Sequence, residues 1–351
     1  MDSLGISFDL TVIWALILAL AVYIYVVLDG FDLGLGILYP LFREKRDRDL
    51  MMNSVAPVWD GNETWLVMGG GGLMAAFPMA YAILMPALYP PVIAMLLALI
   101  FRGVAFEFRF KAGDRLRPVW DAGFAAGSII ATFVQGVALG AFLDGFRVEN
   151  RAFAGGAFDW LTPFALFVGV ALVAGYALLG AAWLVLKTEG ELQDRIWRMM
   201  IPLTAVVLAA VAGVSLWTPL AHEAIADRWV TWPKLFWLSP MPILVAAVAL
   251  LLLRAEAKRL DRQPFPLALA LFGLANAGFC KRVGASILLL VGEGAQDHTW
   301  TAIHFRRRGF LCGCVRRCYR CRCDRQRRRG CAPSGRGRCR AGAQDPPGGL
   351  R

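Results

Sequence analysis

The first 279 residues lack cysteine and contain one histidine, His222, although the whole chain has 8 cysteines and 3 histidines. Haem iron in a helical bundle is commonly held by His, Met or Cys. Methionines are present but are common in apolar spans, so this part of the chain is not expected to ligate haem or another metal. It also lacks a phosphate-binding loop and a dinucleotide fingerprint, which excludes the common nucleotide-binding sites.

Charge is scarce as well: 18% of the residues are charged, 58% are hydrophobic and the mean hydropathy is +0.55. Such a composition excludes an ordinary soluble domain and favours a multi-span membrane protein. The net charge of +11 arises after residue 279, where 17 basic residues face 4 acidic ones, against 20 and 22 before it. We therefore predict two regions, a membrane domain over 1–279 and an unrelated tail over 280–351.

Long uncharged stretches locate the expected spans, because a bilayer core takes about 20 residues of helix. The stretches are Leu10–Leu28, Thr64–Phe101, Ala122–Leu143, Leu161–Leu186, Met199–Ala221, Leu235–Leu253 and Gln263–Cys280. The second is too long for one span and is divided near Pro78, with its first helix starting near Ala56. The sequence predicts an all-α polytopic bundle of about eight transmembrane helices. Acidic Asp2 and Asp9 before the first span predict a retained helix rather than a cleaved signal peptide.

Lysine and arginine alternate between rich and poor in successive loops, with 4, 0, 4, 2, 3, 2 and 4 residues. By the positive-inside rule, the first, third, fifth and seventh loops are cytoplasmic and the N-terminus is outside.

Charged residues at the edges of these spans are the candidate functional residues, because acids within a membrane often mark proton or ion paths. Two pairs, Asp29 with Asp32 and Asp60 with Glu63, are three residues apart and so share a helix face. Arg102 ends a long uncharged run and is followed by Glu107 and Arg109, and Asp121 opens the next span. The alternatives stay open: solvated helix ends for the acids, a snorkelling anchor for Arg102 and a helix-dipole partner for Asp121. The run Gly69–Gly72 predicts close helix packing.

Several of these residues belong to longer motifs. They are Leu28-Asp29-Gly30-Phe31-Asp32-Leu33-Gly34, Asn53-Ser54-Val55-Ala56-Pro57-Val58-Trp59-Asp60-Gly61-Asn62-Glu63, Ala75-Ala76-Phe77-Pro78, Phe101-Arg102-Gly103-Val104-Ala105-Phe106-Glu107-Phe108-Arg109 and Trp120-Asp121. In this order and spacing, residues 1–279 resemble subunit II of cytochrome bd-type quinol oxidases, including the cyanide-insensitive branch.

The resemblance implies nine helices, as two four-helix bundles and a peripheral helix, in a bacterial plasma membrane. It implies a heterodimer in which subunit I carries haem b and haem d, oxidises quinol and reduces O2 to water. A small third subunit and a bound structural quinone are compatible with it, and membrane lipid is an implied partner while nucleic acid is not. The rival reading from the residues alone is a proton-coupled secondary transporter, and a purely structural scaffold is a third.

The resemblance also implies roles for individual residues. Asp29, Asp60 and Glu63 become candidates for a proton path. The remaining candidates support the haem region or the subunit interface: Asp32, Trp59, Asn62, Arg102, Glu107, Arg109 and Asp121.

The tail departs from the family pattern, which stops after Phe279. Out-of-frame translation of a GC-rich gene would produce its Arg, Gly, Cys, Ala and Pro bias. A zinc site at Cys318-Tyr319-Arg320-Cys321 and a basic disordered tail are the alternatives.

Overall fold

The computed structural model describes residues 10–149, 152–221 and 240–274, which all lie in one structural unit of the chain. The predictions for residues 275–351 fall outside the described residues, and so does His222. These predictions concern the end of the eighth span, the boundary at 279 and the three readings of the tail.

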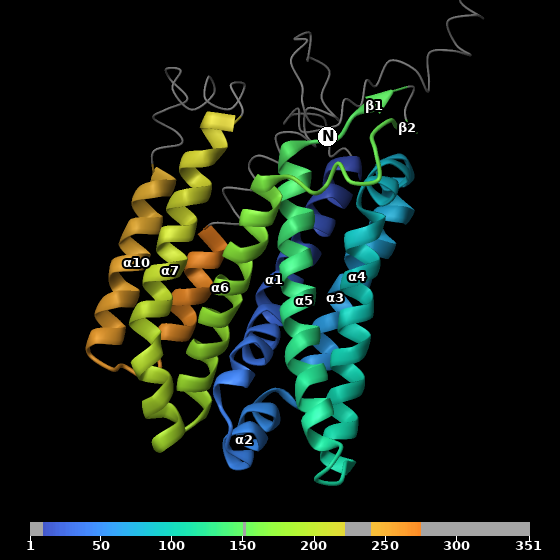
Figure 1. The fold of residues 1–351 in the computed structure, drawn as a ribbon. Helices are drawn as coiled ribbons and strands as arrows, with labels where there is room; N and C mark the ends of the chain where they lie inside the picture. Colours follow the sequence, from blue (N-terminus) through green and yellow to red (C-terminus); the bar gives the residue numbers. More distant parts are fainter. Residues whose placement is uncertain (1–9, 150–151, 222–239, 275–351) are drawn as a thin grey trace, which may run out of the picture. The chain divides into compact units, whose positions relative to one another are not determined.

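The described part is helical, as predicted (Figure 1). Its helices are α1 (Leu10–Leu38), α2 (Lys45–Val55), α3 (Trp59–Ala76), α4 (Pro78–Lys111), α5 (Arg117–Asp144), α6 (Pro163–Lys187), α7 (Glu191–Ala221) and α10 (Pro240–Ala257). A 3-10 turn, η1 (Tyr39–Leu41), follows α1, and a further short apolar helix covers Pro264–Leu274. Strands β1 (Val148–Glu149) and β2 (Ala152–Phe153) pair in an antiparallel hairpin after α5.

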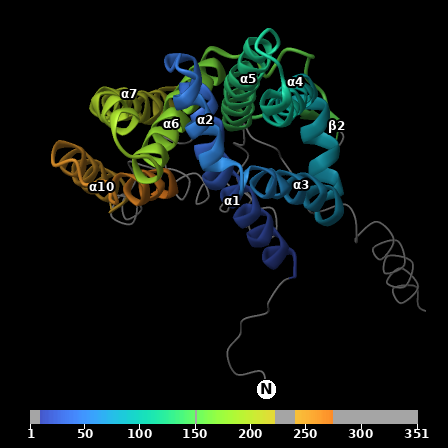
Figure 2. The same ribbon diagram turned by 90° about the horizontal axis from the view of Figure 1, so that it is seen from below.

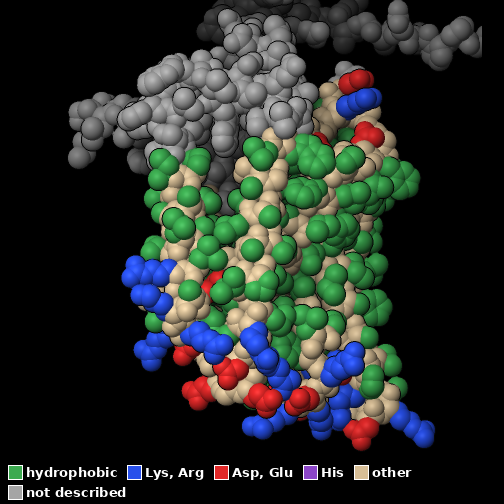
Figure 3. Space-filling view, turned by 60° about the vertical axis from the view of Figure 1, so that its left-hand side comes forward, with side chains coloured by type: hydrophobic (Ala, Val, Ile, Leu, Met, Phe, Trp, Pro, Cys, Tyr) green, Lys and Arg blue, Asp and Glu red, His purple; other side chains and the backbone are tan. Residues whose placement is uncertain are grey.

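Five of the described helical segments are long and apolar enough to cross a membrane: Ile13–Leu41, Pro78–Lys111, Arg117–Asp144, Pro163–Lys187 and Glu191–Thr218. Helices α3 and α10 have 18 residues each. Charged side chains gather at the end of the helices that carries α2, whereas hydrophobic side chains cover their flanks (Figure 3). This distribution is that of a polytopic membrane protein.

Two boundaries differ from the sequence prediction in an informative way. The first span was expected to end at Leu28, but α1 continues through Asp29 and Asp32 to Leu38. Helix α3 begins at Trp59 rather than near Ala56. The predicted division of the long apolar stretch is confirmed, because Phe77 leaves the helical conformation and Pro78 starts α4. Proline suits that first position, where its missing N–H is not needed.

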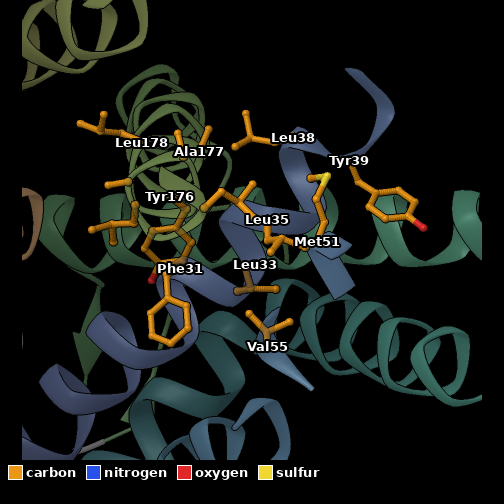
Figure 4. Close-up of a cluster of buried hydrophobic side chains, with 14 of the residues drawn as sticks. Phe31, Leu33, Leu35, Leu38, Tyr39, Met51, Val55, Tyr176, Ala177 and Leu178 are labelled. Atoms are coloured by element: carbon orange, nitrogen blue, oxygen red, sulfur yellow. The ribbon is translucent and has the colours of Figure 1, made fainter. Parts of the chain in front are cut away.

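Helix α1 packs against α3, α5 and α6 (Figure 2). Its C-terminal half contributes Phe31, Leu33, Leu35 and Leu38 to the main hydrophobic core, which also contains Tyr176, Ala177 and Leu178 of α6 (Figure 4). The amphipathic helix α2 closes this core with Met51, Met52 and Val55.

Glycines let α1 and α6 approach closely. A Cβ added to Gly34 would lie 1.8 Å from the carbonyl oxygen of Tyr176, and one added to Gly180 would lie 2.4 Å from the carbonyl carbon of Gly34. Of the predicted glycine run, Gly69 and Gly72 face α1, where an added Cβ would meet Val22 at 3.1 Å and Leu18 at 2.4 Å. Gly70 and Gly71 have no described neighbour within 4 Å of an added Cβ.

The Gly34 contact predicts a stability effect. Gly34→Ala should lower the free energy of unfolding of the detergent-solubilised chain by about 3 kcal/mol, because the methyl group must push backbone apart. Gly71→Ala is the matched control and should leave stability unchanged or slightly raised. Denaturant titration followed by helical circular dichroism would measure the free energy of unfolding of both variants. Equal stability of Gly34→Ala and wild type would contradict the close crossing.

Candidate functional site: two buried ion clusters

The first group of buried polar residues, here called the midspan cluster, consists of Asp29, Asp32, Asn62, Glu63 and Arg102. Asp29 and Asp32 of α1 are 0% exposed, and Arg102 of α4 is 1% exposed. Because α1 continues for two further turns beyond Asp29, both acids lie inside the helix rather than at its end. The solvated-end reading of this pair and the snorkelling reading of Arg102 are therefore wrong.

Contacts within the midspan cluster cross three helices. Asn62 Nδ2 of α3 donates to Asp32 Oδ2 at 2.6 Å and to the Leu28 carbonyl oxygen at 3.3 Å. Arg102 Nη1 donates to Glu63 Oε1 and lies 3.9 Å from Asp29 Oδ1. The residue spacing correctly placed the acids of α1 on one face, and the fold brings that face to Asn62, Glu63 and Arg102.

Hydrogen bonding in the midspan cluster is incomplete. Neither carboxylate oxygen of Asp29 accepts a hydrogen bond of full geometry among the described residues, although the Tyr25 hydroxyl lies near it, and Nε and Nη2 of Arg102 have no acceptor there. Within the described part, one arginine faces three carboxylates. Buried carboxylates that outnumber their cations are costly when all are ionised. The cluster is therefore suited to binding and releasing protons.

A second group, here called the end cluster, joins α2, α4 and α5 near their charged end and consists of Tyr39, Arg48, Asp49, Arg109 and Asp121. Asp121 is its centre, since it accepts hydrogen bonds from Tyr39 Oη at 2.8 Å, Arg48 Nη1 at 2.7 Å and Arg109 Nε at 2.5 Å. Arg109 Nη1 also donates to Asp49 Oδ1 at 2.6 Å. Asp121 thus has direct ion-pair partners, beyond the helix-dipole role considered from the sequence.

The remaining predicted residues lie outside both clusters. Asp60, in the first turn of α3, and Glu107, on α4, are exposed in this chain. Trp59 is partly buried and stacks on Phe106, with ring centroids 5.1 Å apart. Asp60 consequently lies on the exposed side of α3, near Glu63 at the edge of the midspan cluster.

Sequence reasoning missed three members of the end cluster, namely Tyr39, Arg48 and Asp49. Arg48 had been counted among the positive charges of the first loop. A helical spacing of three to four residues could have revealed that this loop is an amphipathic helix with one buried face. That face carries Asp47, Met51, Met52 and Val55. Sequence reasoning also missed Glu256 of α10, which is 2% exposed and accepts from Thr204 Oγ1 of α7 at 2.6 Å.

The described residues contain no histidine or cysteine, and among them no group of three or more His, Cys, Asp or Glu is placed to hold a metal ion. Their donor set is carboxylates, guanidinium groups, amides and phenols.

Long apolar helices with carboxylates and arginines buried between them define a polytopic membrane protein with ionisable clusters between its helices. The profile of the family described as Cytochrome bd terminal oxidase subunit II matches residues 10–288. This chain therefore belongs to the cytochrome bd terminal oxidase subunit II family. The assignment does not favour the transporter alternative.

Individual relatives agree with the family. The Cytochrome bd-I ubiquinol oxidase subunit 2 of Escherichia coli (strain K12) is 39% identical over 211 residues, which are 58% of this chain and 56% of that protein. The Cytochrome bd ubiquinol oxidase subunit 2 of Bacillus subtilis (strain 168) is 29% identical over 282 residues, 79% of each chain. The chain thus spans about half the length of the Escherichia coli relative it matches, at 56%.

The fold also resembles a solved structure. A chain in the structure of bd oxidase from Geobacillus thermodenitrificans aligns with a TM-score of 0.62 and 16% identity, covering 78% of this chain and 84% of that one. At this identity the likeness shows the helical fold alone.

Proposed function

We propose that this chain is the haem-free subunit of a cytochrome bd-type quinol oxidase and supplies protons for the reduction of O2 to water. The haems, when bound in subunit I, supply the redox chemistry. The family assignment and the midspan cluster carry the proposal. Buried carboxylates of this chain hold protons inside the membrane, where oxygen reduction consumes them.

Subunit I would pack on the outer face of α3. This face combines exposed polar and small residues, namely Asp60, Gly61, Thr64, Gly70 and Gly71, with the exposed apolar side chains of Val67 and Met74. By contrast, α4 exposes bulky apolar side chains such as Leu97, Ile100 and Phe101. Small residues allow two helices in a membrane to approach closely, and a carboxylate there needs a polar partner. Asp60 would then lie at the subunit interface, where it can pass protons towards the haem-bearing subunit.

Charge distribution supports an orientation. The loops rich in Lys and Arg gather at the end that carries α2 (Figure 3). We place this end in the cytoplasm of a bacterial cell and the N-terminus outside, following the positive-inside rule. A small third subunit and a structural quinone remain compatible with this arrangement.

Removing the charge of Asp60 tests the proposal. Asp60→Asn should slow O2 reduction by the purified complex about tenfold, because a positioned proton donor is lost. Haem content, read from reduced-minus-oxidised spectra, should stay at the wild-type level. Asp114→Asn is the control, since Asp114 is exposed and pairs only locally with Arg117. Normal turnover in a fully haem-loaded Asp60→Asn complex would refute the proton role. A stable chain that never co-purifies with a haem d band would refute the oxidase itself.

A further inference from the structure

One face of α5 carries polar residues from the charged end of the bundle into its middle. Asp121, Ser128, Thr132 and Gln135, here called the polar face, are spaced by seven, four and three residues. Such spacing aligns side chains on one side of a helix. Asp121, Ser128 and Thr132 are buried, at 7%, 0% and 0% exposure, and Gln135 is partly buried.

The polar face is turned towards α1. A Cβ added to Gly36 would lie 2.0 Å from Ser128 Oγ, so these two residues are in direct contact. Helices α1 and α5 run in opposite directions (Figure 1). Asp29 lies seven residues before Gly36, and Gln135 lies seven residues after Ser128. Two turns along each helix therefore bring Gln135 to the level of Asp29.

Polar atoms along this contact lack partners. Ser128 Oγ donates to the Phe124 carbonyl oxygen at 2.8 Å, the usual solution for a helical hydroxyl. Thr132 Oγ1 makes no such bond and has no hydrogen-bond partner among the described residues. The Tyr176 hydroxyl of α6 lies near Gln135, and the Tyr25 hydroxyl of α1 lies near Asp29, but neither pair has the geometry of a full hydrogen bond. Burying such groups costs free energy unless water completes their hydrogen bonds.

The polar face starts at Asp121, which is also the centre of the end cluster. A single aromatic ring separates this cluster from the midspan cluster. The Phe124 ring lies 5.2 Å from the Tyr39 ring, between centroids, and 5.9 Å from the guanidinium carbon of Arg102. The end cluster and the midspan cluster therefore lie on either side of the Phe124 ring. Along α5, the apolar residues Phe124 and Ala125 interrupt the polar face between Asp121 and Ser128.

We propose that the polar face of α5 carries protons from the end cluster to Asp29. A proton taken up at the Asp121 end passes Phe124 on water and is relayed by the hydroxyls of Ser128 and Thr132. At each hydroxyl one proton arrives as another leaves, so no group changes its charge permanently. Side chains one turn apart on a helix are about 5–6 Å from each other, a gap that one water bridges. This inference rests on the proposed function, and it names α5 as the route by which protons reach Asp29.

Thr132 offers the sharpest test, because valine has the same shape and lacks the hydroxyl. In the purified complex with subunit I, Thr132→Val should slow proton uptake and O2 reduction about fivefold and raise the solvent isotope effect of turnover. Thr132→Ser restores the hydroxyl and should return both rates to within about twofold of wild type. Thr218→Val is the matched control, since Thr218 is a buried threonine of α7 whose hydroxyl donates to its own helix at the Val214 carbonyl oxygen.

A structural role for Thr132 would not produce this pattern. Wild-type turnover of a haem-loaded Thr132→Val complex, or a Thr132→Ser complex as slow as Thr132→Val, would overturn the proposal. If Thr132→Val loses haem, Ser128→Ala takes its place with the same expected slowing and the same contradicting result. The variant Asp29→Asn distinguishes a failure of the proton role of the chain from a failure of the α5 route. Normal turnover of Asp29→Asn refutes the proton role of the chain, whereas a slow Asp29→Asn beside a normal Thr132→Val refutes the α5 route alone.

Discussion

Arg102→Met is expected to destabilise the protein by about 3–5 kcal/mol, because it leaves buried carboxylates without their cation. Arg102 is 1% exposed, contacts Glu63 and lies 3.9 Å from Asp29. Methionine fills much of the same volume as arginine. The decrease in the free energy of unfolding therefore measures the lost charge rather than a cavity. The free energy of unfolding of the solubilised chain, followed by circular dichroism, measures the effect.

Neutralising the partners should reverse part of this loss. The double variant Arg102→Met with Glu63→Gln is expected to be more stable than Arg102→Met alone, since one uncompensated carboxylate is removed. Arg259→Met is the control, because Arg259 pairs with Asp194 at 3.0 Å and both side chains are exposed. Surface pairs of this kind contribute about 1 kcal/mol or less. If Arg102→Met and Arg259→Met had equal effects, the midspan cluster could not be a buried ion network.

Sequence reasoning found the helices because uncharged runs of span length have few other structural solutions. Boundaries were less accessible for a physical reason. The first span was expected to end at the first charge, Asp29, but a carboxylate can continue inside a membrane helix when other helices shield it. Asn62 and Arg102 provide that shielding from α3 and α4. No property of residues 10–38 alone could reveal partners that lie 30 to 70 positions away in the chain.

The candidate site was predicted in part for the same reason. Periodicity pairs Asp29 with Asp32 on one helix, yet only packing decides that Asn62 and Glu63 turn inward while their neighbour Asp60 stays exposed. Tyr39 and Arg48 look like ordinary residues at a membrane boundary in the sequence. Tyr39 on η1 and the partly buried Arg48 on α2 both become partners of Asp121 through tertiary contacts that local patterns do not encode.

The end cluster predicts the second large effect. Asp121→Asn should lower the free energy of unfolding by about 3–5 kcal/mol, because two arginines lose their shared carboxylate in a buried site. An asparagine still offers one acceptor oxygen, but its amide N–H groups oppose the guanidinium donors of Arg48 and Arg109. Asp114→Asn is the matched control on the same α4–α5 connection. Asp114 is exposed and pairs with Arg117 three residues away, so its loss should not change stability measurably.

A second substitution distinguishes lost charge balance from lost hydrogen bonds. Arg109 keeps its pair with Asp49, so Asp121→Asn leaves Arg48 as the cation that has lost its carboxylate. Combining Asp121→Asn with Arg48→Met removes that cation and should recover part of the stability if charge balance dominates. Should geometry dominate instead, the double variant would be less stable than Asp121→Asn, because Arg48 Nε also donates to the Phe42 carbonyl oxygen at 2.7 Å. A stability of Asp121→Asn equal to that of Asp114→Asn would mean that α2 is held by its apolar face alone. Met51, Met52 and Val55 would then suffice to close the core, and the end cluster would be free to serve proton uptake without a structural role.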